Sequence, residues 1–365
     1  MSFGIWDFAL ETHPHGAAAT AAHTHAGLSE TVHPELEDNL QLLNVSIRNA
    51  LSFQKTINEQ QSLPSAKLII MRQFEYRICD VFTDTLFQGN QLAIFEDAGS
   101  LTPAEMQKLA NETNLCETTF IIRRSPEMER LRGVRVRIFT TAEELPFAGH
   151  PTLGTSTFIR QYLREYADRE VITLELNIGA VSVRFSHPSY GAMHGEMTQP
   201  DPVFGQMHDR AAVAQAIGVA TEDLAVDMPL QTISTGLPYC IVPLRSVDAL
   251  SKLRISLSAA EEYLRGRDAK FFYCIAPELK GIWRARMQFY NGEDPATGSA
   301  AGCAISYLVR HGFAASDEQL HIRQGIEIGR PGTIDVRAKL DGVSVREVRV
   351  GGSTVFVANG RFFLE

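Results

Sequence analysis

The sequence is poor in the features that mark several large classes of protein. Its five cysteines are odd in number and none forms a CxxC pair: Cys79, Cys116, Cys240, Cys274 and Cys303. This usage fits neither a disulfide framework nor a zinc site, and it fits a reducing compartment. We therefore expect a cytoplasmic protein.

Long apolar runs and basic clusters are also missing. No stretch reaches the roughly 18 consecutive apolar residues of a membrane helix, and the amino terminus lacks a basic start followed by an apolar run. The formal net charge is −9, and no run of Lys and Arg is interleaved with aromatic residues. We expect neither a membrane nor a nucleic acid as partner.

Nucleotide-binding loops are absent as well. The sequence holds no GxxxxGKS/T loop and no GxGxxG followed by an acidic residue, which disfavours a nucleotide ligand. What is present is a chain of 365 residues, of which 44% are apolar and 21% charged. This composition allows a large core and roughly two domains.

Residues 1–70 differ in composition from the rest. Histidines stand there among Ala, Thr and Gly: His13, His15, His23, His25 and His33. They could bind a metal, but no matching carboxylates accompany them, and such a tract is typical of a solvated, disordered segment. Apolar residues at helical spacing predict one amphipathic helix between residues 35 and 60. We treat residues 1–70 as an N-terminal extension, with Met71 as an alternative start.

From Met71 the chain contains the same order of elements twice. The first series is a strand with Gly89, the helix SLTPAEMQKLA, the strands TTFIIR and VRVRIF, and the turn GHPTLG. The second is a strand with Gly236, the helix SLSAAEEYL, the strands KFFYCIA and WRARMQF, and the turn EDPATGS. Each series then closes with a predicted strand pair, LELNIGAVSVRF and HIRQGIEIGR. The repeat predicts two related halves, residues 71–200 and 201–365, with a chance succession of common elements as the alternative.

Two residue pairs predict where a helix begins in each half. Thr102 with Glu105, and Ser258 with Glu261, each fit the S/T-x-x-E pattern. In this capping box the two side chains satisfy free backbone N–H groups at the helix start. The two helices are therefore predicted independently of the repeat.

The turns GHPTLG and EDPATGS align with identical spacing, so that His150, Pro151, Gly154 and Thr155 correspond to Asp294, Pro295, Gly298 and Ser299. Each Pro is predicted in the first helical turn, where its missing N–H costs nothing. The helix that follows each turn is apolar nearly all round, which predicts a buried central helix. Free N–H groups at two such starts would bind a small carboxylate-bearing substrate. The alternative is that the polar residues only cap the helices.

Four segments resemble a known family: DVFTDTLFQGNQLAIF, NLCETTF, FTTAEELPFAGHPTLGTS and NGEDPATGSAAG. They are similar to segments of the PhzF-like family of phenazine-biosynthesis isomerases, and the resemblance runs from about Met71 to the C-terminus. It implies an α+β fold of two pseudo-symmetric domains, each a curled, antiparallel-rich sheet around a central helix, as in diaminopimelate epimerase. It also implies a homodimeric isomerase without metal or organic cofactor, whose substrate lies between the domains.

The same resemblance assigns roles to individual residues. Glu117 matches the catalytic glutamate that moves a proton between carbons of the substrate, with an ordinary strand-edge glutamate as the alternative. His150 and Asp294 match the residues that hold and polarise the substrate or assist proton transfer. The substrate-binding set that we expect comprises Gly149, Gly154, Thr155, Gly298 and Ser299.

Several positions depart from related patterns. Racemases and epimerases of this fold use one cysteine in each half, and the matching positions here are Gly149 and Asp294, which excludes a two-thiol mechanism. We expect Cys116 and Cys303 to be packing residues. Gln91 stands where the family usually has proline, and we expect only a local backbone change there.

These observations favour an isomerase that shifts a proton on a small carboxylate-bearing molecule, such as a dihydro-hydroxyanthranilate-like ring. A carboxylate with a raised pKa and a donor for the developing negative charge suit that chemistry. An enzyme of the same fold that acts on another acid, and a non-catalytic protein that binds an anionic metabolite, stay open because fold does not fix function.

Overall fold

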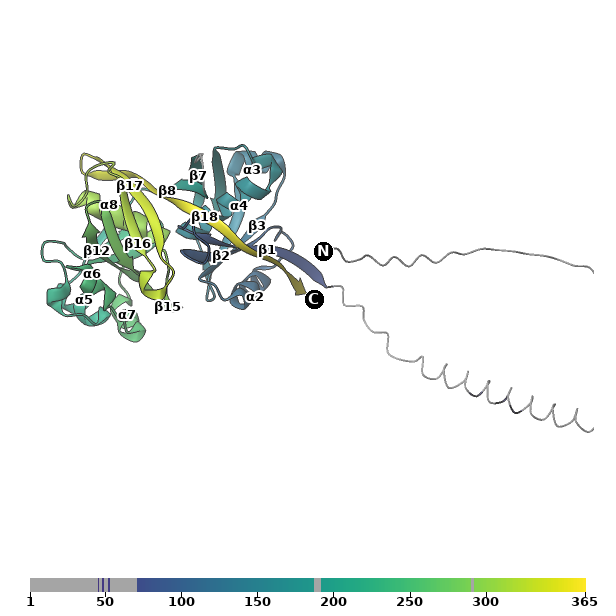
Figure 1. Ribbon diagram of the computed structural model, residues 1–365, viewed down its shortest axis with the longest axis horizontal. Coiled ribbons are helices and arrows are strands. Elements are labelled where there is room, and N and C mark those ends of the chain that lie inside the picture. Colours follow the sequence, from purple (N-terminus) through teal and green to yellow (C-terminus); the bar gives the residue numbers. More distant parts are fainter. Residues whose placement is uncertain (1–44, 46–47, 49–51, 53–70, 187–191, 290–291) are drawn as a thin grey trace, which may run out of the picture. The chain divides into compact units, whose positions relative to one another are not determined.

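The computed structural model (Figure 1) describes residues 45, 48, 52, 71–186, 192–289 and 292–365. The chain divides into two units, Met1–Ile69 and Ile70–Glu365. In the first unit, Val45, Arg48 and Ser52 are described and all three are helical. The histidine-rich tract and the remainder of the helix predicted between residues 35 and 60 lie outside the described residues.

The first series of elements runs from β1 to β8. Its strands are β1 (Arg72–Val81), β2 (Asn90–Phe95), β3 (Glu117–Ile122), β4 (Val134–Phe139), β5 (Glu144–Leu145), β6 (Val171–Leu176), β7 (Gly179–Ser186) and β8 (Met193–Thr198). Its helices are α2 (Pro103–Thr113), α3 (Pro126–Arg132), α4 (Gly149–Tyr162) and the 3₁₀ helix η1 (Arg164–Tyr166). The strands TTFIIR and VRVRIF and the hairpin LELNIGAVSVRF are thus confirmed as β3, β4 and β6–β7.

The second series runs from β9 to β18. Its strands are β9 (Val203–Met207), β10 (Gln231–Ser234), β11 (Pro238–Pro243), β12 (Phe271–Leu279), β13 (Ile282–Arg286), β14 (Gln288–Phe289), β15 (Gly292–Glu293), β16 (Leu320–Gln324), β17 (Gly332–Asp341) and β18 (Ser344–Leu364). Its helices are α5 (Arg210–Ile217), α6 (Val247–Ser251), α7 (Leu257–Leu264) and α8 (Gly298–Arg310), with 3₁₀ helices η2 (Thr221–Asp223) and η3 (Ile326–Ile328).

One large sheet connects both series through β18, the long strand that spans the folded part in Figure 1. Strand β18 pairs with β1 and β8 on one side of the molecule and with β17 on the other. The order β1-β2-β3-β4-β6-β7-β8-β18 returns to β1, so the first series forms a closed barrel. The strands from β17 to β9 continue the same sheet. The result is a mixed α/β fold with a barrel-like sheet.

The pairing pattern of the two series is similar. Strand β2 is parallel to β3, β3 is antiparallel to β4, and β4 is parallel to β6. Strands β11, β12, β13 and β16 repeat that parallel, antiparallel, parallel order. The division near residue 200 into two domains stays a prediction.

Each series wraps around one helix. In α4 every residue from Gly149 to Arg160 is buried, and in α8 every residue from Gly298 to Val309 is buried. Small residues allow the close packing: a Cβ on Gly154 would lie 2.8 Å from Leu92 Cδ2. The predicted buried helices are confirmed. None of the helices among the described residues is long and apolar enough to cross a membrane.

Two local predictions for the second series are wrong. The Thr102–Glu105 capping box is present, but α7 begins at Leu257 after Ser256, so that Ser258 lies inside the helix and its hydroxyl contacts that of Ser256 instead of capping. In HIRQGIEIGR only the first strand is confirmed, because η3 follows it and the partner strand β17 begins at Gly332. Gly325 and Gly329 flank η3 at φ of 79° and 73°, which breaks the extended backbone there.

Candidate active site

Most of the predicted site residues meet in one pocket between α4 and α8, which we call the site pocket. Of the eight predicted residues, six line it: Glu117, Gly149, His150, Asp294, Gly298 and Ser299. Gly154 and Thr155 do not line it; Gly154 faces the sheet, and the Thr155 hydroxyl is 2.9 Å from that of Thr119. The remaining walls are mostly apolar: Thr140, Leu145, Ala148, Leu237, Tyr239, Phe271, Met287, Phe289 and Thr297.

The starts of the two central helices touch each other. A Cβ on Gly149 would lie 2.5 Å from the Ser299 backbone nitrogen and 2.6 Å from the Gly298 carbonyl carbon. Position 149 therefore has no room for any side chain. The facing N–H groups and dipoles favour an anion at this point.

The two turns are less alike than their sequences predict. Pro151 lies in the first turn of α4, as expected. Pro295 does not lie in a helix, because α8 begins at Gly298 after the N-cap Thr297. Two side chains bind the carbonyls of the segment before α8: Gln324 donates to the Asp294 carbonyl at 2.8 Å and Asn90 donates to the Ala296 carbonyl at 2.8 Å. These contacts replace the helical hydrogen bonds that the aligned turn predicts.

Glu117 is the first residue of β3, and its side chain is 13% exposed. Its Oε2 atom is buried and has no hydrogen-bond partner among the described residues. Burial, and secondarily the negative charge of Asp294, raise the pKa of the Glu117 carboxyl well above its ordinary value. The protonated form of this carboxyl is therefore favoured more than that of an exposed glutamate.

His150 faces Glu117 from the second position of α4. The distance from its Nε2 atom to Glu117 Oε2 is 3.5 Å, and Nε2 is likewise buried without a hydrogen-bond partner in the described chain. Burial lowers the pKa of His150 to about 3, against a smaller opposing effect of a backbone hydrogen bond with Gln91. The imidazole is therefore neutral at physiological pH.

Asp294 is the second buried carboxyl of the pocket. Its Oδ1 accepts a hydrogen bond from Asn90 Nδ2 at 2.6 Å, and its Oδ2 accepts one from the Thr297 hydroxyl at 2.6 Å. Burial raises the pKa of Asp294 to about 6, although the hydrogen bonds from Thr297, Asn90 and Cys116 act in the opposite direction. Cys116 thus packs partly into the core, as predicted, and in addition contacts the site.

Four residues that the sequence did not single out support the pocket. Tyr239 OH is 2.8 Å from Ser299 Oγ. Gln324, fully buried on β16, donates to Thr297 Oγ1 at 2.8 Å and accepts from Tyr273 OH at 3.0 Å. Asn90 and Thr297 lie within the segments DVFTDTLFQGNQLAIF and NGEDPATGSAAG, where a polar side chain next to apolar residues could have indicated a buried hydrogen-bonding role. Tyr239 and Gln324 lie on distant strands and carry no local signal.

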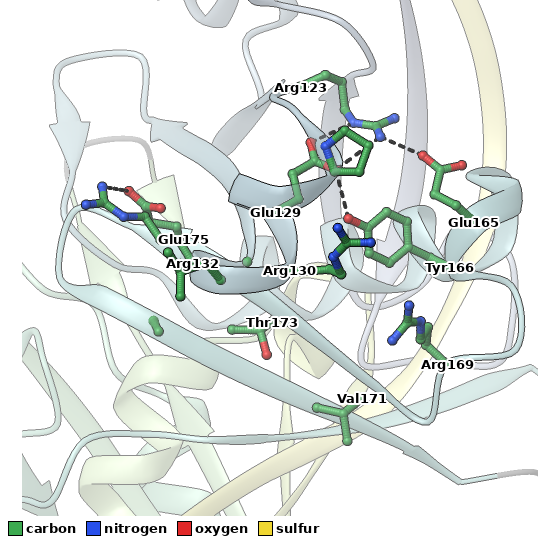
Figure 2. A pocket seen from close by; sticks show the side chains of 14 residues that line it. Arg123, Glu129, Arg130, Arg132, Glu165, Tyr166, Arg169, Val171, Thr173 and Glu175 are labelled. Carbon is green, nitrogen blue, oxygen red and sulfur yellow. Dashed lines mark hydrogen bonds and ion pairs between the residues drawn. The ribbon is translucent and has the colours of Figure 1, made fainter.

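A second pocket, which we call the arginine pocket, lies beside α3, η1 and β6 (Figure 2). Its carboxylates are Glu129, Glu165 and Glu175, and each is paired with an arginine. Glu129 also accepts a hydrogen bond from Tyr166 OH at 2.8 Å, as Figure 2 shows. None of the predicted site residues lines this pocket.

Two carboxyl groups and a neutral imidazole at two helix starts in a barrel-like α/β fold are an arrangement suited to acid–base chemistry. Comparison with known proteins identifies it further. The family model described as phenazine biosynthesis-like protein matches residues 79–360. The chain belongs to this family, and it is an isomerase.

Individual relatives cover most of the chain. A trans-2,3-dihydro-3-hydroxyanthranilate isomerase from Pseudomonas aeruginosa is 34% identical over 292 residues, 79% of this chain and 99% of the relative. The protein of the same name from Pseudomonas fluorescens is 32% identical over 292 residues, with the same coverage. A solved structure described as a predicted epimerase from Pseudomonas aeruginosa is 34% identical, has a TM-score of 0.70, and is matched over 80% of this chain and 100% of its own.

Proposed function

We propose that this protein is a cofactor-independent isomerase that moves a proton between two carbons of a small carboxylate-bearing substrate, with Glu117 as the catalytic acid and base. One observation carries the proposal. Glu117 Oε2 and His150 Nε2 face each other across 3.5 Å, and both atoms are buried without a hydrogen-bond partner among the described residues. Such unpaired polar atoms are costly to bury, which points to a partner supplied by the substrate.

The proposed step needs no oxidant and no added group. The Glu117 carboxylate takes a proton from one substrate carbon, that C–H bond breaks, and its electron pair enters the conjugated system of the substrate. The protonated Glu117 then returns the proton to a second carbon, where a new C–H bond forms. The raised pKa of Glu117 supports the return of the proton as well as its removal, because burial and the negative charge of Asp294 make this carboxylate a stronger base than an exposed glutamate.

The substrate class that we propose is a small, unsaturated ring acid like trans-2,3-dihydro-3-hydroxyanthranilate. The N–H groups at the starts of α4 and α8 would hold its carboxylate. Apolar walls formed by Leu145, Leu237, Phe271, Met287 and Phe289 suit a flat ring. The names of the relatives support the same class.

Further expectations accompany this proposal. We infer that the two series of elements are pseudo-symmetric domains divided near residue 200, each with its central helix. The strand-pairing order, which is the same in both series, supports this division. We also propose a homodimer in the cytoplasm. A monomeric mass in light scattering would contradict the dimer.

The decisive experiment follows the proton by NMR in D₂O. With trans-2,3-dihydro-3-hydroxyanthranilate as substrate, the unmodified protein should convert it, and deuterium should appear at the second carbon to the extent that the proton held on Glu117 exchanges with D₂O before it is returned. Glu117→Gln should lower the rate by about 10³-fold or more while substrate binding is nearly intact. Glu129→Gln, the matched change in the arginine pocket, should leave the rate unchanged.

The outcomes separate the alternatives. An undiminished rate in Glu117→Gln would overturn the proposed role of this residue. If the unmodified protein does not convert this substrate, a screen of small carboxylic acids for thermal stabilisation identifies the acid that binds the folded state. Conversion of another acid that depends on Glu117 would replace the substrate and keep the mechanism.

A further inference from the structure

Asn90, the first residue of β2, contacts both the Asp294 carboxylate and the His150 imidazole of the site pocket. It is fully buried. Its Nδ2 atom lies 2.6 Å from Asp294 Oδ1, 2.8 Å from the Ala296 carbonyl oxygen and 3.0 Å from His150 Nδ1. A single amide nitrogen therefore contacts the turn before α8 and the first turn of α4.

The orientation of this amide follows from its oxygen neighbours. The Ala296 carbonyl can only accept, and so can the ionised Asp294 carboxylate, so the nitrogen and not the oxygen of Asn90 faces them. This orientation persists even though Asn90 Oδ1 is left buried without a partner among the described residues. The two N–H bonds of the amide are shared among three acceptors, as in a three-centre hydrogen bond.

The orientation of Asn90 favours one protonation state of the ring beside it, in competition with the Gln91 backbone carbonyl, which accepts from a ring N–H. Because Nδ2 is a donor, a proton on His150 Nδ1 would place two donors against each other at 3.0 Å. A neutral imidazole with a bare Nδ1 carries its proton on Nε2. That proton lies on the side of Glu117 Oε2, 3.5 Å away.

We propose that Asn90 is a positioning residue that fixes His150 in the Nε2–H tautomer, so that the imidazole presents its proton to Glu117 throughout the reaction. This role rests on the proposed function of Glu117. In the proposed reaction Glu117 alone carries the proton between the substrate carbons, and His150 keeps its own proton. Asn90 itself touches neither the reacting atoms nor the pocket surface, since it acts through His150 and Asp294.

The test reads the tautomer directly. In protein labelled with ¹⁵N at histidine, long-range ¹H–¹⁵N NMR spectra distinguish a protonated from a bare ring nitrogen, and His150→Gln identifies the signals of this residue. We expect a protonated Nε2 and a bare Nδ1. Nδ1–H in the unmodified protein would overturn the proposal, and this measurement needs no variant of Asn90 to fold and no substrate.

Asn90→Asp sharpens the test because it replaces the donor by an acceptor of the same shape. It should move the proton to Nδ1 and lower kcat by about 10²-fold, with KM changed less than about threefold. A changed kcat without a changed tautomer would show a merely structural effect and overturn the role. Thr119→Val, which removes the buried Thr119–Thr155 hydrogen bond in the same barrel, should change neither spectrum nor kcat.

The proposed function and this inference fail in different ways. Undiminished turnover in Glu117→Gln refutes proton transfer by Glu117. It then also removes the catalytic reason for holding His150 in the Nε2–H tautomer. Nδ1–H in the unmodified protein refutes the role of Asn90 and leaves the proton transfer by Glu117 intact.

Discussion

The site pocket and the arginine pocket differ in whether their ionisable side chains have hydrogen-bond and ion-pair partners. In the arginine pocket Glu129, Glu165 and Glu175 each meet an arginine, and Glu129 also meets Tyr166. In the site pocket the facing atoms Glu117 Oε2 and His150 Nε2 are buried, and neither has a hydrogen-bond partner in the described residues. Paired charges stabilise the fold, whereas unpaired buried groups indicate chemistry. The pairing of the carboxylates therefore distinguishes the two pockets.

The largest contrast should come from deleting one carboxylate in each pocket. Asp294→Ala removes the acceptor of Asn90 and Thr297 beside the helix starts, so we expect kcat/KM to fall by about 10²- to 10³-fold with weaker binding. Glu165→Ala in the arginine pocket should leave both unchanged. Steady-state kinetics and calorimetry with 3-hydroxyanthranilate, an aromatic analogue, measure the two effects. Equal losses in both variants would remove the functional distinction between the pockets.

The pH dependence of stability should have opposite signs in the two pockets. The folded-state pKa of Asp294, about 6, is above its ordinary value, so its contribution to stability is present below pH 4 and is lost as the pH rises to about 6. Relative to Asp294→Asn, the unmodified protein should lose about 3 kcal/mol over this range. Arg123 and neighbouring donors lower the pKa of Glu129 despite its burial, so its contribution is present above its ordinary pKa and is lost as the pH falls.

Urea unfolding at several pH values tests this contrast. The difference in free energy of unfolding between the unmodified protein and Asp294→Asn should decline from pH 4 to pH 6. The corresponding difference for Glu129→Gln should rise with pH. A flat difference for Asp294 would contradict the raised pKa.

Isosteric amides should also separate the pockets in stability. Glu129→Gln removes the charge that Arg123 meets at 3.0 Å, and we expect a loss of about 2 kcal/mol in the free energy of unfolding at pH 7. Glu117→Gln removes a buried charge next to Asp294, so stability should stay equal or increase. Urea midpoints at constant m-value measure the difference. A marked destabilisation by Glu117→Gln would mean that this carboxyl is structurally paired.

Local sequence patterns predicted the elements and most of the site because their signals are local. The buried helices, the Thr102 cap and the β6–β7 hairpin follow from neighbouring residues. The sequence misplaces the start of α8 because Asn90 and Gln324, far away in the chain, bind the carbonyls of the residues before it and keep them outside the helix. The family motifs indicate Glu117 and Asp294, but the raised pKa of both carboxyl groups and the unpartnered Oε2 atom of Glu117 depend on three-dimensional burial. Spacing in the sequence carries no such information.

The smallest contrast concerns two tyrosines, each of which donates or shares one hydrogen bond with a pocket residue. Tyr166→Phe removes the bond to Glu129, and we expect a loss of about 1 kcal/mol in stability with unchanged kinetics, because none of the predicted site residues lines the arginine pocket. Tyr239→Phe removes the bond to Ser299, whose hydroxyl is then free to rotate at the predicted carboxylate site. We expect KM to rise by about three- to tenfold with little change in kcat, since substrate and transition state would lose the same contact. An unchanged KM in Tyr239→Phe would show that Ser299 needs no support from the second series of strands, and a raised KM in Tyr166→Phe would connect the arginine pocket to substrate binding.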